Sequence, residues 1–266
     1  MPNHGGFGGT PVPLNRVPAV TAGFWLIKLL AVTVGETAAD YLAVNLGYGL
    51  STTTWIMSVV LLATLVLQFA QKRYVPWAYW LAVVMISIVG TLITDNMVDN
   101  LDIALQTSTI FFCVVLAATF AVWYATERTL SIHTIYTTRR EIFYWLAILF
   151  TFSLGTSAGD LVSEHFGLGY LISGIMFAVV VAAVAVAYFA FRIDGVLAFW
   201  LAYILTRPVG ASFGDLLAQP TEYGGLGLGT VVTSWLFLGA IAAVVVLMTV
   251  NGGRAAARRP TELPMA

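Results

Sequence analysis

Residues 24–40 read FWLIKLLAVTVGETAAD, and this stretch decides the fold because its skeleton recurs three more times. The skeleton is an aromatic residue, Trp, Leu, eight residues, Gly, four residues and Asp. The other copies are YWLAVVMISIVGTLITD at 79–95, YWLAILFTFSLGTSAGD at 144–160 and FWLAYILTRPVGASFGD at 199–215. Copies one and two start 55 residues apart, as do copies three and four, and the two pairs are 120 residues apart. This spacing indicates a unit that was duplicated twice, and such repeats dictate the architecture.

The composition indicates a membrane protein. The chain has 266 residues, of which 59% are hydrophobic and 9% charged, whereas a soluble domain averages about 25% charged residues. Long unbroken apolar runs, such as residues 175–191, favour helices over the alternating strands of a membrane barrel. The single cysteine, Cys113, excludes a disulfide within the chain. Residues 1–18 lack the apolar centre of a signal peptide, so we expect a loose tail there.

We therefore predict an all-α membrane protein with eight transmembrane helices. The helices form four tandem, parallel helical-hairpin repeats, with pseudo-twofold or fourfold symmetry along the membrane normal. The predicted spans are 20–44, 52–71, 77–101, 104–125, 142–164, 169–191, 195–218 and 229–250. The repeats, at about 20–75, 76–130, 140–193 and 194–250, make one transmembrane domain over 20–250. A flexible cytoplasmic tail at 1–19 and a second cytoplasmic tail at 251–266 flank that domain.

The basic residues predict the orientation. Ten of the twelve fall in the tails and in loops on one side, namely Arg16, Lys72, Arg73, Arg128, Arg139, Arg140, Arg192, Arg254, Arg258 and Arg259. By the positive-inside rule, both termini are cytoplasmic and the four motif helices run outward. The repeated Trp is then expected in the aromatic belt at the inner interface. The repeated Gly is typical of close helix packing, and the Asp lies about 22 Å beyond the Trp, near the outer surface.

Acidic residues recur at that outer level. Four are the repeated Asp residues, and three more lie four residues away on the same helix face. Ionisable groups within spans usually face a bundle interior or a water-filled cavity, and this many carboxylates cannot all stay ionised together without cations or protons. The alternative is that each Asp pairs with a local partner and only stabilises the bundle. The candidate metal ligands are Asp40, Asp95, Asp160, Asp215, Glu36, Asp99 and Glu164.

Hydroxyl groups are predicted at the same depth, at the starts of the return helices and inside the motifs. Carboxylate, hydroxyl and carbonyl oxygens suit hard cations such as Mg²⁺, Ca²⁺ and Mn²⁺. His165 is the only histidine near this level, which disfavours zinc, copper and haem. No catalytic Ser-His-Asp set is evident, so we expect no enzyme activity and no resident cofactor.

Two basic residues lie inside the spans. Lys28 is in the first motif and Arg207 in the fourth, and we expect both to compensate the acidic charge or to compete with a bound cation. Pro208 follows Arg207 and removes a helix hydrogen bond, so the run at 207–212 is a candidate for local unwinding.

The motifs Gly35-Glu36-Thr37…Asp40, Thr94-Asp95, Gly155-Thr156…Gly159-Asp160 and Arg207-Pro208…Asp215 resemble a bacterial family of membrane-anchored proteins. The resemblance covers residues 20–250 and implies an inner-membrane location without a mechanism. Small manganese and calcium exporters are similar in design, because they also repeat acidic motifs in duplicated helices. This chain lacks their Glu-x-Gly-Asp signature, so no site residues are carried over.

The resulting hypothesis is a secondary transporter or exporter of a small hard cation, with Mn²⁺ as the first candidate and with proton coupling and homo-oligomerisation left open. The expected partners are the inorganic cation, protons and the lipid bilayer, without nucleic acid. The alternatives are a passive cation channel, because rings of acids also build cation filters, and a scaffold without transport.

Overall fold

The computed structural model describes residues 14–257, and every long element in that part of the chain is an α-helix. All eight long helices have the length and composition needed to cross a membrane, which confirms the predicted fold class. Residues 1–13 and 258–266, the outer parts of the two predicted tails, lie outside the described residues. The helices are α1 (Ala22–Asp40), α2 (Leu50–Phe69), α3 (Pro76–Asp95), α4 (Leu105–Glu127), α5 (Thr138–Asp160), α6 (Gly169–Phe191), α7 (Gly195–Ala218) and α8 (Thr230–Ala257).

Local signals define where the motif helices begin. The side chains of Thr21, Thr137 and Asp194 accept a hydrogen bond from the backbone N–H three residues later, which caps α1, α5 and α7. Helix α3 begins at Pro76, whose missing N–H costs nothing in a first turn. Each motif helix therefore begins between two and six residues before its aromatic-Trp pair.

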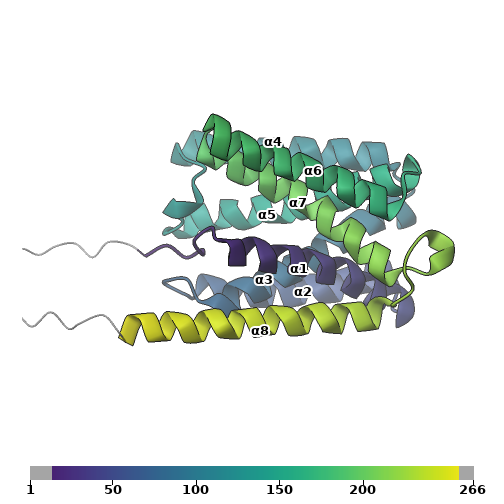
Figure 1. Ribbon diagram of the computed structural model, residues 1–266, viewed down its shortest axis with the longest axis horizontal. Coiled ribbons are helices and arrows are strands. Elements are labelled where there is room, and N and C mark those ends of the chain that lie inside the picture. The colour runs from purple at the N-terminus through teal and green to yellow at the C-terminus, as the bar shows by residue number, and fades with distance from the viewer. Residues whose placement is uncertain (1–13, 258–266) are drawn as a thin grey trace, which may run out of the picture.

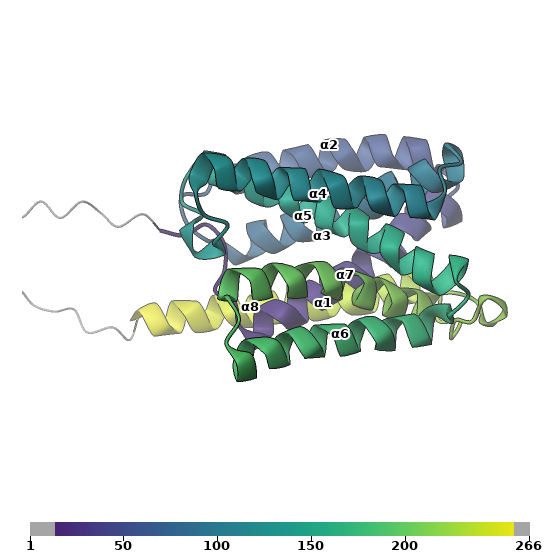
Figure 2. The same cartoon turned by 90° about the horizontal axis from the view of Figure 1, so that it is seen from above.

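The four motif helices form an inner ring. Helix α1 packs against α3, α3 against α5, α5 against α7, and α7 closes the ring on α1 (Figures 1 and 2). At each contact the repeated Gly meets the residue three positions before the Gly of the neighbouring helix. A Cβ on Gly35, Gly90, Gly155 or Gly210 would overlap Ser87, Phe152, Arg207 or Val32, respectively. The predicted close-packing role of the Gly is thus confirmed.

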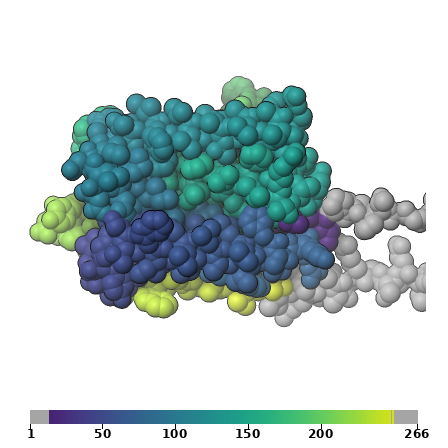
Figure 3. All heavy atoms as spheres, turned by 180° about the vertical axis from the view of Figure 1, so that it is seen from behind, coloured from purple at the N-terminus to yellow at the C-terminus, as the bar shows by residue number. Residues whose placement is uncertain are grey.

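The return helices form an outer layer. Helix α2 packs mainly against α3, α4 against α5, α6 against α7, and α8 against α1. Each return helix therefore covers the motif helix of the following repeat, and not the partner with which it would form a simple hairpin. Large apolar side chains cover the outward faces, including Phe189 and Trp235, which are 78% and 72% exposed, as expected for a lipid-facing surface. Figure 3 shows α2 and α4 covering one such face.

The structure does not show the local unwinding that was predicted at 207–212. Helix α7 runs unbroken through Pro208, and the proline ring lies next to Gly155 and Gly159 of α5. The irregular turns come after the repeated Asp instead. Helices α1, α3 and α5 each continue into one wider π-helical turn, at Tyr41–Asn45, Asn96–Asn100 and Leu161–His165, a feature often found at functional sites.

The first residues of the described chain, which belong to the predicted tail at 1–19, make specific contacts with the bundle. Asn15 binds Ile132 and Ile135 of the α4–α5 connection, and its carbonyl accepts a hydrogen bond from Tyr74. Arg16 donates to Glu141 of α5 at 2.6 Å. These contacts hold two loops together at the end of the bundle where the motif helices begin, which we call the basic end.

The repeated Trp does not form a lipid-facing belt. Trp80, Trp145 and Trp200 are at most 5% exposed, and they pack against the aromatic residues of neighbouring motif helices. The Trp80 ring lies 5.6 Å from Phe24, for example. Three of the four Trp side chains are therefore buried between helices and stabilise the inner ring, so they are not available to contact lipid.

We expect Gly90→Ala to lower the stability of the purified protein by about 1–3 kcal/mol, because its Cβ would lie 2.8 Å from the Phe152 Cβ. Gly239→Ala is the matched control, since no atom lies within 4 Å of the added Cβ. Thermal unfolding in detergent should separate the two variants. Equal melting temperatures would show that the ring is not held by close approach at the glycines.

Candidate cation-binding site

A pocket of about 170 Å³ lies where the carboxyl ends of the motif helices meet. All seven acidic residues predicted as metal ligands line it, and no Lys, Arg or His is among the residues that line it. The apolar side chains Val44, Leu50, Val98 and Leu105 form part of its rim, together with Gln219. The lining residues are Glu36, Asp40, Val44, Leu50, Asp95, Val98, Asp99, Leu105, Asp160, Glu164, Asp215 and Gln219.

Three of the carboxylates come closest together at the bottom of the pocket. One oxygen each of Glu36, Asp160 and Asp215 lies within 4.8 Å of the other two. Glu36 and Asp215 are only 5% and 7% exposed, whereas Asp99 and Glu164 lie exposed at the mouth. The deep carboxylates repel one another strongly in such a poorly hydrated place, and a cation or bound protons would relieve that repulsion.

The ends of the helices add to the negative potential of the pocket. The carboxyl end of a helix carries a partial negative charge from the helix dipole, and the Asp-bearing ends of the four motif helices meet here. The wider turns after Asp40, Asp95 and Asp160 also lie at this level. In α7 no such turn follows, and Gln219 instead donates from its amide to Asp40 at 3.1 Å.

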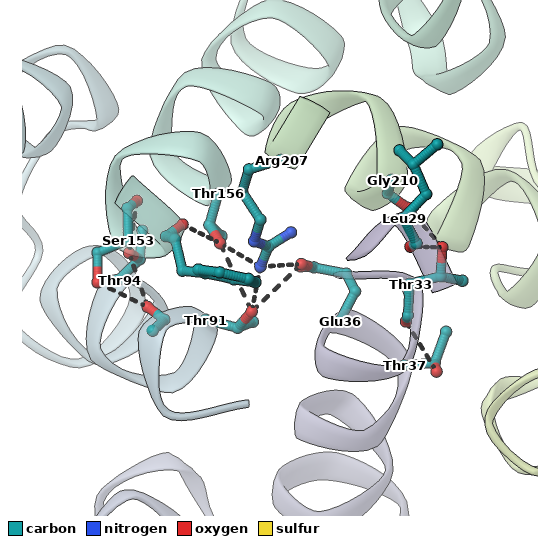
Figure 4. Close-up of polar contacts among 12 residues, drawn as sticks. Leu29, Thr33, Glu36, Thr37, Thr91, Thr94, Ser153, Thr156, Arg207 and Gly210 are labelled. Atoms are coloured by element: carbon teal, nitrogen blue, oxygen red, sulfur yellow. Dashed lines mark hydrogen bonds and ion pairs between the residues drawn. The ribbon is translucent and has the colours of Figure 1, made fainter. Parts of the chain in front are cut away.

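Arg207 closes the pocket from below. Its Nη2 atom donates to Glu36 at 2.8 Å and to the hydroxyls of Thr91 and Thr156 at 2.5 and 2.7 Å, as Figure 4 shows. The side chain is fully buried, and its Nε and Nη1 atoms have no partner within the described part of the chain. The charge-compensating contact predicted for Arg207 is thus present, and it is made to Glu36.

The repeat register explains this arrangement. Glu36, Thr91, Thr156 and Ala211 each follow the repeated Gly, so the inner ring brings all four positions together on its axis. Arg207 replaces Val32, Ser87 and Phe152 of the other repeats at the level below. An arginine from one repeat thus reaches the axial residues of the other three, and Ala211 leaves room in its own repeat.

Lys28 does not compensate the acids as predicted. Its ammonium group is fully buried and donates to the Tyr203 carbonyl at 2.9 Å and to the Thr206 hydroxyl at 2.5 Å. No carboxylate forms an ion pair with it within residues 14–257. Lys28 lies two helical turns before Glu36 on α1, and Arg207 occupies the space between it and the pocket.

Acidic residues at the basic end have a different environment. Glu141 is fully buried and pairs with Arg16, while Gln68 and Trp145 donate to its second oxygen. Glu127 pairs with Arg139 and with Arg140. Among the seven pocket acids, only Glu36 has an ion pair in the described chain. The acids at the basic end thus pair with arginines, whereas Asp40 and Glu164 in the pocket accept only a hydrogen bond from an uncharged side chain.

The predicted layer of hydroxyl ligands does not line the pocket. Thr37 bonds Ser234, Thr109 bonds Ser157, and Ser51 bonds Asn96, so these hydroxyls join neighbouring helices. His165 is exposed and contacts Gln106. The reason is geometric: the return helices lie outside the ring, where their hydroxyls cannot reach the axis.

Two features could not be predicted from a single copy of the motif. One is the wider turn after the Asp, and the other is the position of Phe152, whose ring lies against Lys28 and Arg207. Comparing the four copies column by column would have marked Phe152, because it shares a register position with Arg207.

Comparison with known proteins agrees with the fourfold repeat. The profile described as Repeat of Unknown Function (DUF347) matches the chain four times, at residues 23–74, 78–129, 143–194 and 198–253. Each match begins one residue before an aromatic-Trp-Leu motif. No curated protein and no solved structure matches the chain. Because the four matches cover most of its length, the chain belongs to the family described as Repeat of Unknown Function (DUF347).

Proposed function

We propose that this protein is a secondary transporter, acting as an exporter, for a small hard inorganic cation, with Mn²⁺ as the first candidate. The observation that carries the proposal is the pocket lined by seven carboxylates, of which only Glu36 is paired with a basic side chain in the described chain. Oxygen-only ligand sets select Mg²⁺, Ca²⁺ and Mn²⁺ over soft metals. The pocket of about 170 Å³ has room for an ion that keeps several waters.

A transporter fits this arrangement better than a passive channel. A channel needs a continuous path, whereas the axis below the pocket is occupied by the buried Arg207 and Lys28 side chains and by a fully buried layer containing Tyr79 and Tyr144. The hydroxyls of Tyr79 and Tyr144 lie 2.5 Å apart, which leaves no space for an ion between them. Access from the basic end therefore requires a conformational change, as alternating access does.

The orientation is proposed from the charge of the loops. The basic residues of the loops lie at the basic end, so the positive-inside rule places that end and both termini in the cytoplasm of a bacterial cell. The acidic pocket then opens to the outside of the inner membrane, which makes this conformation the one that releases an exported ion.

We expect the purified wild-type protein to bind Mn²⁺ in a calorimetric titration, and Asp160→Asn and Asp215→Asn each to weaken binding at least about tenfold. Removing one charge at about 4 Å from an ion removes on the order of 4 kcal/mol per unit charge at an effective dielectric constant of 20. Glu222→Gln is the control, because Glu222 is exposed and does not line the pocket. Unchanged affinity in both Asp variants would contradict the proposal.

The same variants distinguish a binding site from a scaffold. Asp160→Asn should raise the melting temperature of the metal-free protein, because it relieves repulsion among unpaired carboxylates while keeping the shape of the side chain. A scaffold role, in which Asp160 pairs with a local partner, requires the opposite sign. Thermal unfolding in the presence of a chelator measures the difference.

In proteoliposomes we expect saturable Mn²⁺ flux of at most about 10³ ions per second, because each ion must wait for a conformational change on the millisecond scale. Asp160→Asn should abolish the flux at equal protein content. Unitary currents in planar bilayers, which need far higher rates, would favour the passive channel.

The proposed topology is tested with Lys72→Cys and Glu222→Cys, each in a Cys113→Ser background. Both positions are exposed, and they lie at opposite ends of the bundle. A membrane-impermeant maleimide should label Glu222→Cys in intact cells and Lys72→Cys only after the membrane is opened. The reverse pattern would place the acidic pocket in the cytoplasm.

A further inference from the structure

Lys28 is a buried titratable group that the cation pocket does not use. It is fully buried in the centre of the ring, and both of its hydrogen-bond partners, the Tyr203 carbonyl and the Thr206 hydroxyl, are uncharged. The ammonium lies 4.7 Å from the centre of the Tyr203 ring. At a fully buried position, a positive charge with no anion beside it is costly, and its presence therefore calls for a reason.

The charges around Lys28 do not balance when it is protonated. Lys28 and Arg207 lie against the same ring, with Nζ 5.7 Å and Cζ 5.5 Å from the centre of Phe152. Glu36 is the one acid paired with either of them in the described chain. Arg207 and Glu36 already balance each other as a pair, so the charge on Lys28 is left without an ion-pair partner, and release of its proton would remove that charge. A guanidinium does not release its proton in proteins, whereas a buried ammonium does.

The other groups that face Lys28 are weaker candidates for this proton. On α7 they are Tyr203 and Arg207. On α3 and α5, Tyr79 and Tyr144 lie about one turn nearer the basic end and are bonded to each other. Helix α8 has no titratable residue between Thr230 and Leu247. Glu36 lies on α1 itself, on the far side of Arg207.

We propose that Lys28 carries a coupling proton that is exchanged for the cation in the acidic pocket. This inference rests on the proposed transport function and names its coupling ion. When Lys28 is protonated, its charge repels Arg207 toward Glu36, so the guanidinium neutralises the acids and competes with the cation. When a cation binds, the positive charge in the pocket favours release of the Lys28 proton to solution. Linkage requires the reverse effect to be equally large.

The structure also provides hydroxyl groups on the side of Lys28 away from the pocket. The hydroxyls of Tyr79 and Tyr144 lie between Lys28 and the basic end, and the Tyr203 hydroxyl is buried without a partner in the described chain. Buried polar atoms without protein partners usually bind ordered water. A proton leaving Lys28 in that direction would reach the side opposite the pocket, as exchange across a membrane requires.

The test is the number of protons released per Mn²⁺ bound, measured by calorimetry in buffers of different ionisation enthalpy. Lys28→Met should release about one proton fewer than the wild type at the pH where wild-type release is greatest. Ile148→Met is the matched control, because Ile148 is the buried, uncharged residue at the same register position of α5. An unchanged proton count in Lys28→Met overturns the proposal.

Lys28→Arg separates a coupling role from a structural one. A permanent charge should lower Mn²⁺ affinity relative to the wild type at alkaline pH, whereas the neutral Lys28→Met should raise it at acidic pH. A side chain that only fills space would shift both affinities in the same direction, and that result also overturns the proposal. If Lys28→Arg does not fold, the proton count of Lys28→Met decides alone.

Proteoliposomes provide the functional measurement. An imposed pH gradient should drive Mn²⁺ uphill in the wild type, while Lys28→Met should retain exchange of Mn²⁺ for Mn²⁺ but lose the response to the gradient. If the wild type neither binds nor moves Mn²⁺, the proposed function fails. If the wild type does both and Lys28→Met responds fully to the gradient, only the assignment of Lys28 fails.

Discussion

The close approach of neighbouring motif helices at the repeated Gly is the constraint on which the structure depends. At each of the four contacts a Cβ on the Gly would overlap the adjacent helix, so only Gly lets the ring close at this distance. Without the hydrophobic effect between helices in lipid, such packing is what holds membrane helices together. The narrow ring then brings the next residue of every motif onto one axis, and it brings the Asp residues one turn later to one pocket.

The charged residues and the proline that break the fourfold symmetry lie where the first and fourth repeats meet. Lys28 and Glu36 belong to the first repeat and Arg207 and Pro208 to the fourth, and these repeats are far apart in the chain but adjacent in the ring. Helix α8 packs on α1 and closes the outer layer across the same junction. The duplicated helices thus provide the acids that all repeats share. Sequence divergence between the first and fourth repeats provides the two basic residues that lie below these acids. An acidic pocket with a charged floor follows from these two features together.

Several elements were predictable because they depend on local pattern. The eight helices follow from apolar length, and the common level of the acids follows from identical spacing. The seven acids line one pocket as their register suggested. The hydroxyls were not predictable in the same way, since depth alone does not say whether Thr109 or Ser51 faces the axis or a neighbouring helix. The same limit applies to Trp80, whose burial depends on which helix covers it.

The sequence by itself determined the number of helices, their parallel repeats and the depth of the acidic residues, because these depend on hydrophobicity and spacing along one chain. Tertiary structure decided which helix neighbours which, and therefore that each return helix covers the next repeat. It also decided that Arg207 contacts Glu36 while Lys28 contacts none of the described acids. Such pairings depend on distances between helices that are about 170 residues apart, and the periodicity of a single segment contains no information about them.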